Sequence, residues 1–239
     1  MVSIIIPTYN DLHNLQRCLN SIKEQTYTNY EVWIIDGRST DGTQAYLETL
    51  GSPFNWISAE DNGVYDAMNK GIAHSSGEWL YFLGADDTFA TSTVLFALFQ
   101  EQKWSTDLIL GEIVYRSNGD HRLNGKRKRS FFSSRLWLRN SIHHQGVFYK
   151  STLFNKEVYD SSYEILGDYA FNLALYRSGV SYTKTNTLIA NCGASGISKN
   201  YVWEMYKEEI DLKVKASSKM LRPFFFIIAA LKWLLKKLT

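Results

Sequence analysis

The chain has 239 residues, 45% of them hydrophobic, which is ample for one large or two small globular domains with a real core. A formal net charge of +2 and a pI near 8.4 exclude a generally basic nucleic-acid binder, so any basic function has to come from local clusters. The two cysteines, Cys18 and Cys192, predict neither a disulfide framework nor a zinc site, which is typical of a reducing compartment such as the cytoplasm.

The first ninety residues alternate between strand and helix patterns joined by short links. Apolar and β-branched runs predict strands at residues 2–6, 30–35, 54–59 and 80–83. Apolar residues at helical spacing predict helices at residues 12–22, 39–50 and 64–74, and Asp11 is expected to cap the first of them. This alternation is typical of an α/β fold with a mostly parallel, doubly wound sheet.

The regular alternation stops after residue 91. Helices are predicted at residues 92–102, 167–178 and 201–217, and strands at residues 107–115, around 145–149 and at 180–190. Residues 116–129 are predicted as a polar loop that ends in a basic run at residues 126–129. Such a run is typical of a solvated loop, and the functional alternative is contact with the phosphates of a ligand or a membrane.

Acidic residues follow three of the predicted strands. Asp36, Asp61 and Asp86 each stand at the carboxyl end of a strand, and in a parallel sheet these ends share one edge. Asp87 follows Asp86, and two adjacent carboxylates repel each other unless a cation such as Mg²⁺ or Mn²⁺ lies beside them. The pattern predicts a metal-bridged phosphate site, and the alternative is that each aspartate caps the following helix.

The two ends of the chain differ in character. The N-terminus enters the first strand directly and has no signal-peptide pattern, which agrees with a cytoplasmic protein. At the C-terminus, the apolar stretch at residues 223–231 is shorter than the roughly 18 residues that a membrane-spanning helix needs. We expect residues 220–239 to form a basic amphipathic helix on the anionic inner face of the plasma membrane, and the alternative is a helix packed on the domain or on a partner subunit.

Six ordered segments resemble the family 2 glycosyltransferases of the GT-A fold. They are SIIIPTYN at residues 3–10, IIDGRSTDGT at 34–43, EDNGVYDAMNKGI at 60–72, GEWLYFLGADD at 77–87, HQGVFYK at 144–150 and GDYAFNL at 167–173. The likeness covers nearly all of residues 1–190 and is to bacterial members that build O-antigen, capsule or exopolysaccharide. It implies a GT-A domain at residues 1–195, with a nucleotide-binding half at 1–90 and an acceptor half at 91–195, followed by a C-terminal helical extension at 196–239.

The resemblance implies a nucleoside site at the ends of the first three strands. Pro7, Thr8 and Tyr9 correspond to the loop that packs beside the nucleoside. Asp36 corresponds to the aspartate that accepts a hydrogen bond from the base, and Asp61 to one near the base or ribose. Because a carboxylate matches the N–H of uracil, thymine or guanine, the implied donor is a UDP sugar foremost, with GDP and dTDP sugars as alternatives.

The metal site departs from the family pattern. The DXD motif corresponds to Gly84, Ala85 and Asp86, so its first aspartate is missing. The resemblance implies that Ala85 and Asp86 contact the donor, that Asp86 holds Mn²⁺ or Mg²⁺ on the diphosphate, and that Asp87 assists directly or through water.

A second departure lies in the predicted helix at residues 64–74. The alanine, arginine, asparagine triplet of the family is Ala67, Met68 and Asn69 here, so a cation near the phosphates is lost while Asn69 remains as a donor-site residue. Lys70 is a candidate replacement for that cation, and a surface lysine is the alternative.

The acceptor side carries the implied general base. Asp168 corresponds to the acidic residue that takes the proton of the acceptor hydroxyl as this oxygen attacks the anomeric carbon. Its alternative role is an N-cap, and Glu164 is the second candidate base. His144, followed by Gln145, is expected to bind the metal or the leaving phosphate, and a structural histidine is the alternative.

These features predict an inverting, metal-dependent hexosyltransferase that moves a sugar from a nucleotide diphosphate to a hydroxyl of a lipid-linked saccharide in surface-polysaccharide synthesis. A nucleotide-dependent oxidoreductase is disfavoured because no GxGxxG turn follows the first strand. A non-catalytic nucleotide-sugar or membrane-binding module on the same fold is the alternative, because Gly84 and Met68 depart from the family pattern.

Overall fold

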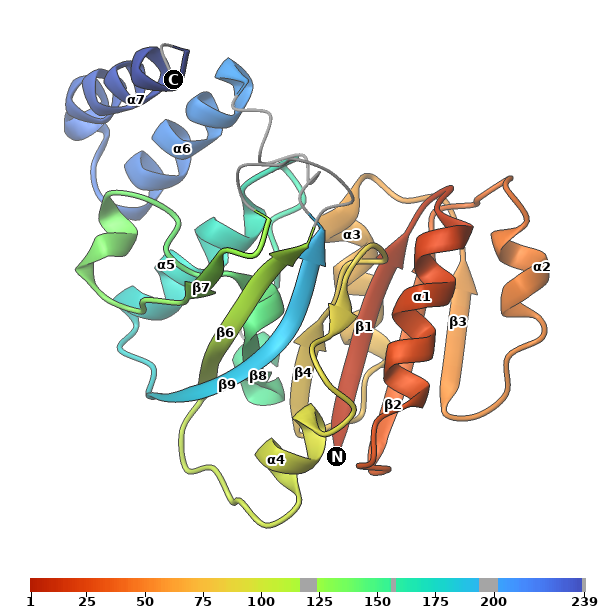
Figure 1. The fold of residues 1–239 in the computed structure, drawn as a ribbon. Helices are drawn as coiled ribbons and strands as arrows, with labels where there is room; N and C mark the ends of the chain where they lie inside the picture. Colours follow the sequence, from red (N-terminus) through yellow and green to blue (C-terminus); the bar gives the residue numbers. More distant parts are fainter. Residues whose placement is uncertain (117–123, 156–157, 194–201, 238–239) are drawn as a thin grey trace.

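The structure is a computed structural model that describes residues 1–116, 124–155, 158–193 and 202–237. A curled sheet runs through the molecule, helices cover both of its faces, and two C-terminal helices stand together at one corner (Figure 1). This is the α/β architecture with a helical extension that the sequence predicts. The expected domain boundary at residues 195 and 196 and residues 117–123 of the polar loop lie outside the described residues.

The first half of the sheet is parallel. β1 (Val2–Thr8) lies between β2 (Tyr30–Asp36) and β4 (Trp79–Phe82), and β3 (Phe54–Ser58) pairs with the other side of β2. All four strands run in the same direction, so their carboxyl ends lie on one edge of the sheet. This edge carries the residues that the sequence assigns to the donor.

The second half of the sheet is mixed. β8 (Val147–Lys150) pairs antiparallel with β4 and with β6 (Leu108–Arg116), and β9 (Tyr182–Gly193) runs parallel to β6. The short strands β5 (Thr88–Phe89) and β7 (Arg127–Arg129) pair antiparallel with β9 and β6. The predicted parallel arrangement therefore holds for residues 2–82, and β5 and β8 run in the opposite direction.

Helices form a layer on each face of the sheet (Figure 1). α1 (Leu12–Lys23) and α4 (Val94–Phe99) cover one face, and α3 (Val64–His74) and α5 (Gly167–Arg177) cover the other. The remaining helices are α2 (Thr43–Leu47), α6 (Trp203–Ala216) and α7 (Arg222–Lys237), with the 3₁₀ helices η1 (Ser134–Trp137), η2 (His144–Gly146), η3 (Ser151–Asn155) and η5 (Lys219–Leu221).

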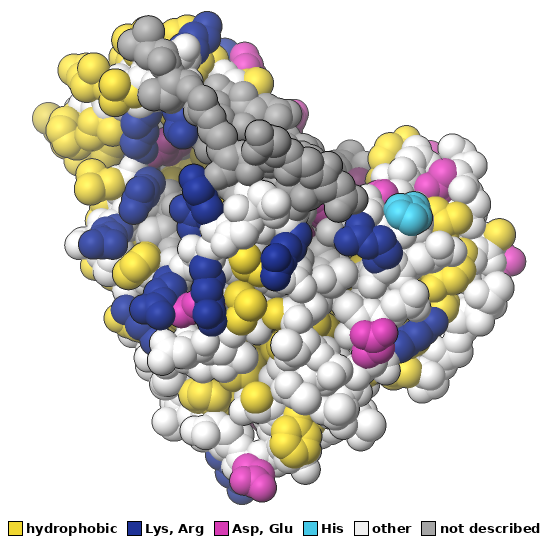
Figure 2. All heavy atoms as spheres, viewed as in Figure 1, with side chains coloured by type: hydrophobic (Ala, Val, Ile, Leu, Met, Phe, Trp, Pro, Cys, Tyr) yellow, Lys and Arg dark blue, Asp and Glu magenta, His cyan; other side chains and the backbone are white. Residues whose placement is uncertain are grey.

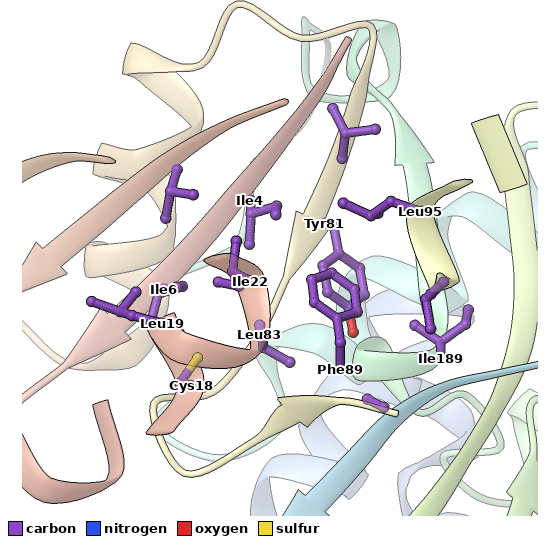
Figure 3. Close-up of a cluster of buried hydrophobic side chains, with 14 of the residues drawn as sticks. Ile4, Ile6, Cys18, Leu19, Ile22, Tyr81, Leu83, Phe89, Leu95 and Ile189 are labelled. Carbon is purple, nitrogen blue, oxygen red and sulfur yellow. The ribbon is translucent and has the colours of Figure 1, made fainter. Parts of the chain in front are cut away.

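Alternate residues of β1 enter two separate cores. Ile4 and Ile6 pack on the α1 side of the sheet, in a cluster that includes Leu19 and Tyr81 (Figure 3). Ile5 points to the opposite face and joins the core that the sheet forms with α3, α5 and α6. Because all three isoleucines are fully buried, β1 is the central strand that the apolar run predicts.

Helix α3 has the predicted bounds, whereas α2 and α4 are shorter than predicted. The backbone N–H groups of Ser39 and Thr40 donate to the side chains of Asp36 and Asn10, at 3.2 and 2.7 Å, instead of entering a helix. Gly42 then adopts a positive φ of 95° immediately before α2. Because these backbone N–H groups are bound to side chains, the first turn of the helix predicted at residues 39–50 does not form.

A buried ion cluster fastens the two C-terminal helices to the rest of the molecule. Lys213 of α6 is only 2% exposed and donates to Glu209 Oε1, and its burial lowers the pKa of the ammonium group. Lys232 of α7 donates to the same carboxylate and to the carbonyl of Leu138, which follows η1. No helix in the described ranges is long and apolar enough to cross a membrane.

Candidate active site

Tyr9, Gly37 and Asp61 lie together beyond the carboxyl ends of β1, β2 and β3. A Cβ atom added at Gly37 would lie 2.9 Å from Asp61 Oδ2 and 3.2 Å from Tyr9 Cδ2, so both side chains pack over this glycine. Tyr9 is 66% exposed, and Asp61 Oδ1 accepts a hydrogen bond from Gly63 N at 3.0 Å. These residues form a shelf, the Tyr9–Asp61 shelf, that combines an open aromatic face with a carboxylate.

Asp36 lies behind the Tyr9–Asp61 shelf. It is fully buried, and its carboxylate accepts hydrogen bonds from Ser39 N at 3.2 Å and from Ser58 Oγ at 2.6 Å. The contact with a base that the sequence predicts for Asp36 is not open in this conformation, because the two serines enclose its oxygens. Asp36 instead joins β2 to β3 beneath the shelf.

Pro7 and Thr8 end β1 beside the shelf. Thr8 is buried, and within the described part of the chain its Oγ1 has no hydrogen-bond partner. The backbone carbonyl of Thr8 accepts a hydrogen bond from Gly37 N at 3.0 Å, which holds the glycine of the shelf against β1. A buried hydroxyl without a partner is costly, and a ligand group that reached it would remove this cost.

Asp87 stands on a turn beyond the end of β4 and is almost fully buried. Its Oδ1 accepts a hydrogen bond from Gly193 N at 2.8 Å, and its Oδ2 accepts from Gln145 Nε2 at 3.1 Å and from Gly84 N at 3.3 Å. Burial, followed by the neighbouring charge of Asp86, raises the pKa of Asp87 to about 6. Asp87 therefore holds the turn in shape by binding three separate segments.

Asp86 is the more accessible of the two adjacent aspartates. Among the residues that the structure describes, no hydrogen bond or ion pair reaches its carboxylate, which lies against Gly193. A half-buried carboxylate without such a partner, next to a buried one, is a hard oxygen ligand set that fits Mg²⁺ or Mn²⁺. Since the described ranges contain no cluster of three or more metal-ligating side chains, a cation here would need phosphate or water oxygens to complete its shell.

Asp168 lies in the first turn of α5 and is only 8% exposed. Its Oδ1 lies 2.8 Å from Tyr169 N and 3.2 Å from the Tyr65 hydroxyl, and its Oδ2 lies 3.3 Å from His144 Nδ1 and 3.4 Å from Asn140 Nδ2. Burial alone would raise the pKa of Asp168, but the hydrogen bond and charge of His144 and the other donors outweigh it and lower the pKa below its ordinary value. Asp168 is therefore ionised at neutral pH, and Oδ2 is its less tightly bound oxygen.

Two consecutive residues connect Asp168 with the aspartate pair. His144 contacts Asp168, and the next residue, Gln145, donates to Asp87. The carbonyl of Gln145 also accepts a hydrogen bond from the Tyr81 hydroxyl of β4 at 2.8 Å, which fixes η2 against the strand that leads to the aspartates. Carboxylates from the two halves of the chain thus contact adjacent residues of one short segment.

Asn69 and Lys70 both bind other parts of the protein. The amide of Asn69 pairs with the main chain of Tyr159, through Nδ2 to the carbonyl at 2.7 Å and Oδ1 to the N–H at 3.0 Å. Lys70 Nζ lies 3.1 Å from Asp66 Oδ2 and donates to the Glu60 carbonyl. Asn69 therefore joins α3 to the segment before α5, and Lys70 is bound near the start of its own helix.

The basic run at residues 126–129 is largely a strand, not the loop that the sequence predicts. Arg127 and Arg129 of β7 both form ion pairs with Glu112 of β6, which is 2% exposed. A buried carboxylate needs a cationic partner, and two arginines on the neighbouring strand provide one. This pairing explains why the run adopts regular structure.

Tyr65 and Asn140 contact Asp168 without any signal in the sequence. Tyr65 occupies a buried position of α3 that any large apolar residue would satisfy, and Asn140 lies in an irregular segment. Their approach to Asp168 depends on how α3, η1 and α5 pack, which a local pattern does not encode. Glu164, the second candidate base, is exposed on the surface.

Comparison with known proteins identifies the class of this fold and site. The profile described as Glycosyl transferase family 2 matches residues 3–182, and the chain belongs to this family. A PGL/p-HBAD biosynthesis glycosyltransferase from Mycobacterium bovis is 36% identical over 191 residues, which cover 77% of this chain and 73% of the relative.

Solved structures share the fold. Staphylococcus aureus TarS 1-349 in complex with UDP-GlcNAc matches with a TM-score of 0.68 at 18% identity, over 98% of this chain and 71% of that chain, whereas the match to the longer TarS chain covers 40% of it. The mannosyltransferase PcManGT from Pyrobaculum calidifontis, in complex with GDP-Man and Mn²⁺, matches with a TM-score of 0.60 at 17% identity, over 96% of this chain and 72% of that chain. The predicted GT-A fold is confirmed, and the protein is a glycosyltransferase.

Proposed function

We propose that this glycosyltransferase catalyses inverting, divalent-metal-dependent transfer of a hexose from a nucleotide diphosphate sugar, UDP sugars foremost, to a hydroxyl of a lipid-linked saccharide. The observation that carries the proposal is the position of His144 and Gln145 between Asp168 and Asp87. Inverting displacement needs a site for the departing diphosphate on one side of the anomeric carbon and a proton acceptor on the other. The aspartate pair at residues 86 and 87 supplies the site for the diphosphate, and Asp168 supplies the proton acceptor.

The nucleoside is proposed to bind on the Tyr9–Asp61 shelf. The Asp61 carboxylate is suited to accept the N3–H of uracil, and Tyr9 is suited to cover the flat face of the base. The Thr8 hydroxyl, which has no partner in the described ranges, is suited to meet a ribose or phosphate group. Pro7 and Asp36 frame this shelf from below. The two solved relatives bind UDP-GlcNAc and GDP-Man, whose bases both carry an N–H that a carboxylate can accept.

Asp86 is proposed to hold the cation on the diphosphate, beside Ala85 on the same turn. Its carboxylate has no hydrogen-bond partner among the described residues, whereas Asp87 is already bound by three donors and supports the turn. His144 presents Nδ1 to Asp168, so Nε2 is the nitrogen left for the metal or a phosphate oxygen. A bound Mn²⁺ or Mg²⁺ supplies Lewis-acid stabilisation of the negative charge on the departing phosphate.

Asp168 is proposed as the general base. Its Oδ2 takes the proton of the acceptor hydroxyl as the new oxygen–carbon bond forms, and the electron pair of the broken sugar–phosphate bond leaves with the diphosphate. The pKa of Asp168, lower than its ordinary value, keeps the carboxylate ready to accept at neutral pH. Substitution by one direct attack inverts the anomeric centre.

The proposal is tested with a panel of UDP, GDP, dTDP and CMP sugars. In the presence of Mn²⁺ we expect slow hydrolysis of at least one UDP sugar, measured as release of UDP, and loss of this activity when EDTA removes the metal. Metal-independent hydrolysis would contradict the metal assignment. No hydrolysis or transfer with any donor would contradict the proposal and favour a non-catalytic binding module.

The exposed face of α7 is proposed to bind the inner face of the plasma membrane. Phe225 and Ala229 are buried against the domain, but six apolar side chains of α7 are 50–64% exposed. Figure 2 shows that hydrophobic side chains gather on the surface of the corner that α7 forms in Figure 1, with Lys and Arg side chains next to them. Lys236 and Lys237 end the helix, so an anionic bilayer matches both the apolar and the basic character of this face. The six exposed residues are Phe224, Phe226, Ile227, Leu231, Leu234 and Leu235.

Sedimentation with liposomes tests the membrane contact. The double variant Leu231→Gln, Leu234→Gln is expected to lose binding to vesicles that contain phosphatidylglycerol while its UDP-sugar hydrolysis is unchanged. The matched control is Phe96→Gln, since Phe96 is 46% exposed on α4. Undiminished sedimentation of the double variant, or equal loss in the control, would contradict the contact through α7.

A further inference from the structure

The segment that leads into α5 is held by a side chain from the C-terminal extension. Glu208 of α6 accepts hydrogen bonds from the backbone N–H groups of three consecutive residues. Oε1 lies 2.8 Å from Glu164 N and 3.3 Å from Ile165 N, and Oε2 lies 3.0 Å from Ile165 N and 2.8 Å from Leu166 N. One carboxylate thus binds the whole approach to the helix that carries Asp168.

Glu208 places a negative charge just before the N-terminus of α5, where it accepts from the N-cap residue and from the two residues before it. The N-cap position of α5 is Leu166, which has no side-chain acceptor for the free N–H groups at the start of the helix. A negative charge near a helix N-terminus is stabilising, and charge-assisted hydrogen bonds are stronger than neutral ones. Glu208 supplies both from a helix that follows α5 in the chain.

Tyr65 holds the same segment from the opposite side. Its hydroxyl lies 2.8 Å from the Ile165 carbonyl and 3.2 Å from Asp168 Oδ1, so its proton is shared between these two acceptors. The ring packs on Gly167, where an added Cβ atom would lie 2.8 Å from the nearest ring atoms. Ile165 is therefore bound at its N–H by Glu208 and at its carbonyl by Tyr65.

We propose that Glu208 and Tyr65 are positioning residues that fix the general base Asp168, so that the C-terminal extension completes the active site. The inference rests on the proposed role of Asp168. Glu208 lies beyond residues 3–182, the range that the family profile matches, so the extension contributes a part of the site that the matched range does not contain. Asp168 follows the clamped segment by two residues in the first helical turn, and a shift of this segment therefore moves its carboxylate.

The test measures UDP release from the UDP sugar that the wild type hydrolyses fastest in the presence of Mn²⁺, together with the Kd of UDP. Glu208→Ala and Tyr65→Phe are expected to lower kcat about 10- to 100-fold, the effect of a displacement near 1 Å, with the Kd of UDP unchanged. Glu208→Gln keeps one acceptor oxygen and is expected to fall between Glu208→Ala and the wild type. Tyr65→Phe removes the hydroxyl and keeps the ring on Gly167.

Two control variants change residues of the same type in similar surroundings to the test residues. Glu204→Ala alters a glutamate on the same helix whose recorded partner is the exposed Lys207 at 3.6 Å, and Tyr149→Phe removes a buried hydroxyl that donates to Asn172 of α5 at 3.1 Å. Both are expected to keep the wild-type kcat. Thermal unfolding of each variant identifies any loss of folded protein.

Three outcomes would overturn the inference: a wild-type kcat in folded Glu208→Ala and Tyr65→Phe, a parallel rise in the Kd of UDP, or equal losses in the controls. Asp168→Asn separates this failure from failure of the proposed function. If Asp168→Asn is inactive while Glu208→Ala is fully active, only the positioning role is wrong. If Asp168→Asn keeps wild-type turnover, the assignment of the base is wrong.

Discussion

Gly193, at the end of β9, has no room for a side chain, and we therefore predict a selective loss of activity in the variant Gly193→Ala. A Cβ atom added at this position would overlap Asp86 Oδ2, well inside the 3.0 Å below which real contacts do not occur. Gly193→Ala therefore forces the Asp86 carboxylate to move by about 1 Å, since the end of a side chain yields more easily than the strand. If Asp86 is the metal ligand that we propose, a shift of this size costs about 100-fold in turnover, or about 2.7 kcal/mol.

The assay for Gly193→Ala is UDP release from a UDP sugar as the concentration of Mn²⁺ is varied. We expect a lower kcat and a higher Mn²⁺ requirement, with the thermal unfolding temperature close to that of the wild type. Gly51→Ala is the control, because no atom lies within 4 Å of a Cβ at that position. Wild-type turnover and wild-type Mn²⁺ dependence in Gly193→Ala would refute the placement of Asp86 at the metal.

Two further predictions concern the attachment of the C-terminal helices. Glu209→Ala leaves the buried Lys213 and its neighbour Lys232 without their carboxylate. We therefore expect the free energy of unfolding in urea to fall by about 3 kcal/mol. A loss below about 1 kcal/mol would contradict the role of the ion cluster. The hydrogen bond from Lys215 lowers the pKa of Asp160 to about 2, below its unfolded value of about 3.9. The contribution of Asp160 is therefore present above about pH 4 and is lost progressively as the pH falls through 2. Because the pair is exposed, we expect Asp160→Asn to differ from the wild type by less than about 1 kcal/mol at neutral pH and by a smaller amount at pH 2. A difference that grows on acidification would contradict this account.

The elements of the first half of the chain could be predicted because their signals are local. The apolar run of β1 and the helical spacing of α3 depend on neighbouring residues, and both elements formed as predicted. Asp11 is the N-cap residue of α1, as predicted, but the capping contact comes from a distant residue, which a local pattern does not indicate. Asp11 makes no cap hydrogen bond, and Asp41 from the loop before α2 accepts from Leu12 N at 2.8 Å instead.

The contacts of the candidate-site residues could be predicted only in part from the sequence. Motif order indicated that Asp86 and Asp168 belong to one site, whereas the enclosure of Asp36 depends on Ser39 and Ser58, which approach from a loop and a neighbouring strand. The clamp by Glu208 was not predicted either. Its three backbone donors come from a segment distant in sequence, and an isolated glutamate on a charged helix carries no pattern that marks such a contact.

The most direct test of the account compares Asp86→Ala with Asp168→Asn in two measurements, the kcat of UDP release and the Kd of UDP with Mn²⁺. The account predicts that Asp86→Ala loses turnover and weakens Mn²⁺-dependent binding of UDP, because Asp86 is proposed to hold the cation on the diphosphate. It predicts that Asp168→Asn loses about 100-fold or more in kcat with the Kd of UDP unchanged, because Asp168 is proposed to act on the acceptor side. Equal loss of turnover and UDP affinity in Asp168→Asn, or wild-type turnover in either variant, would contradict it.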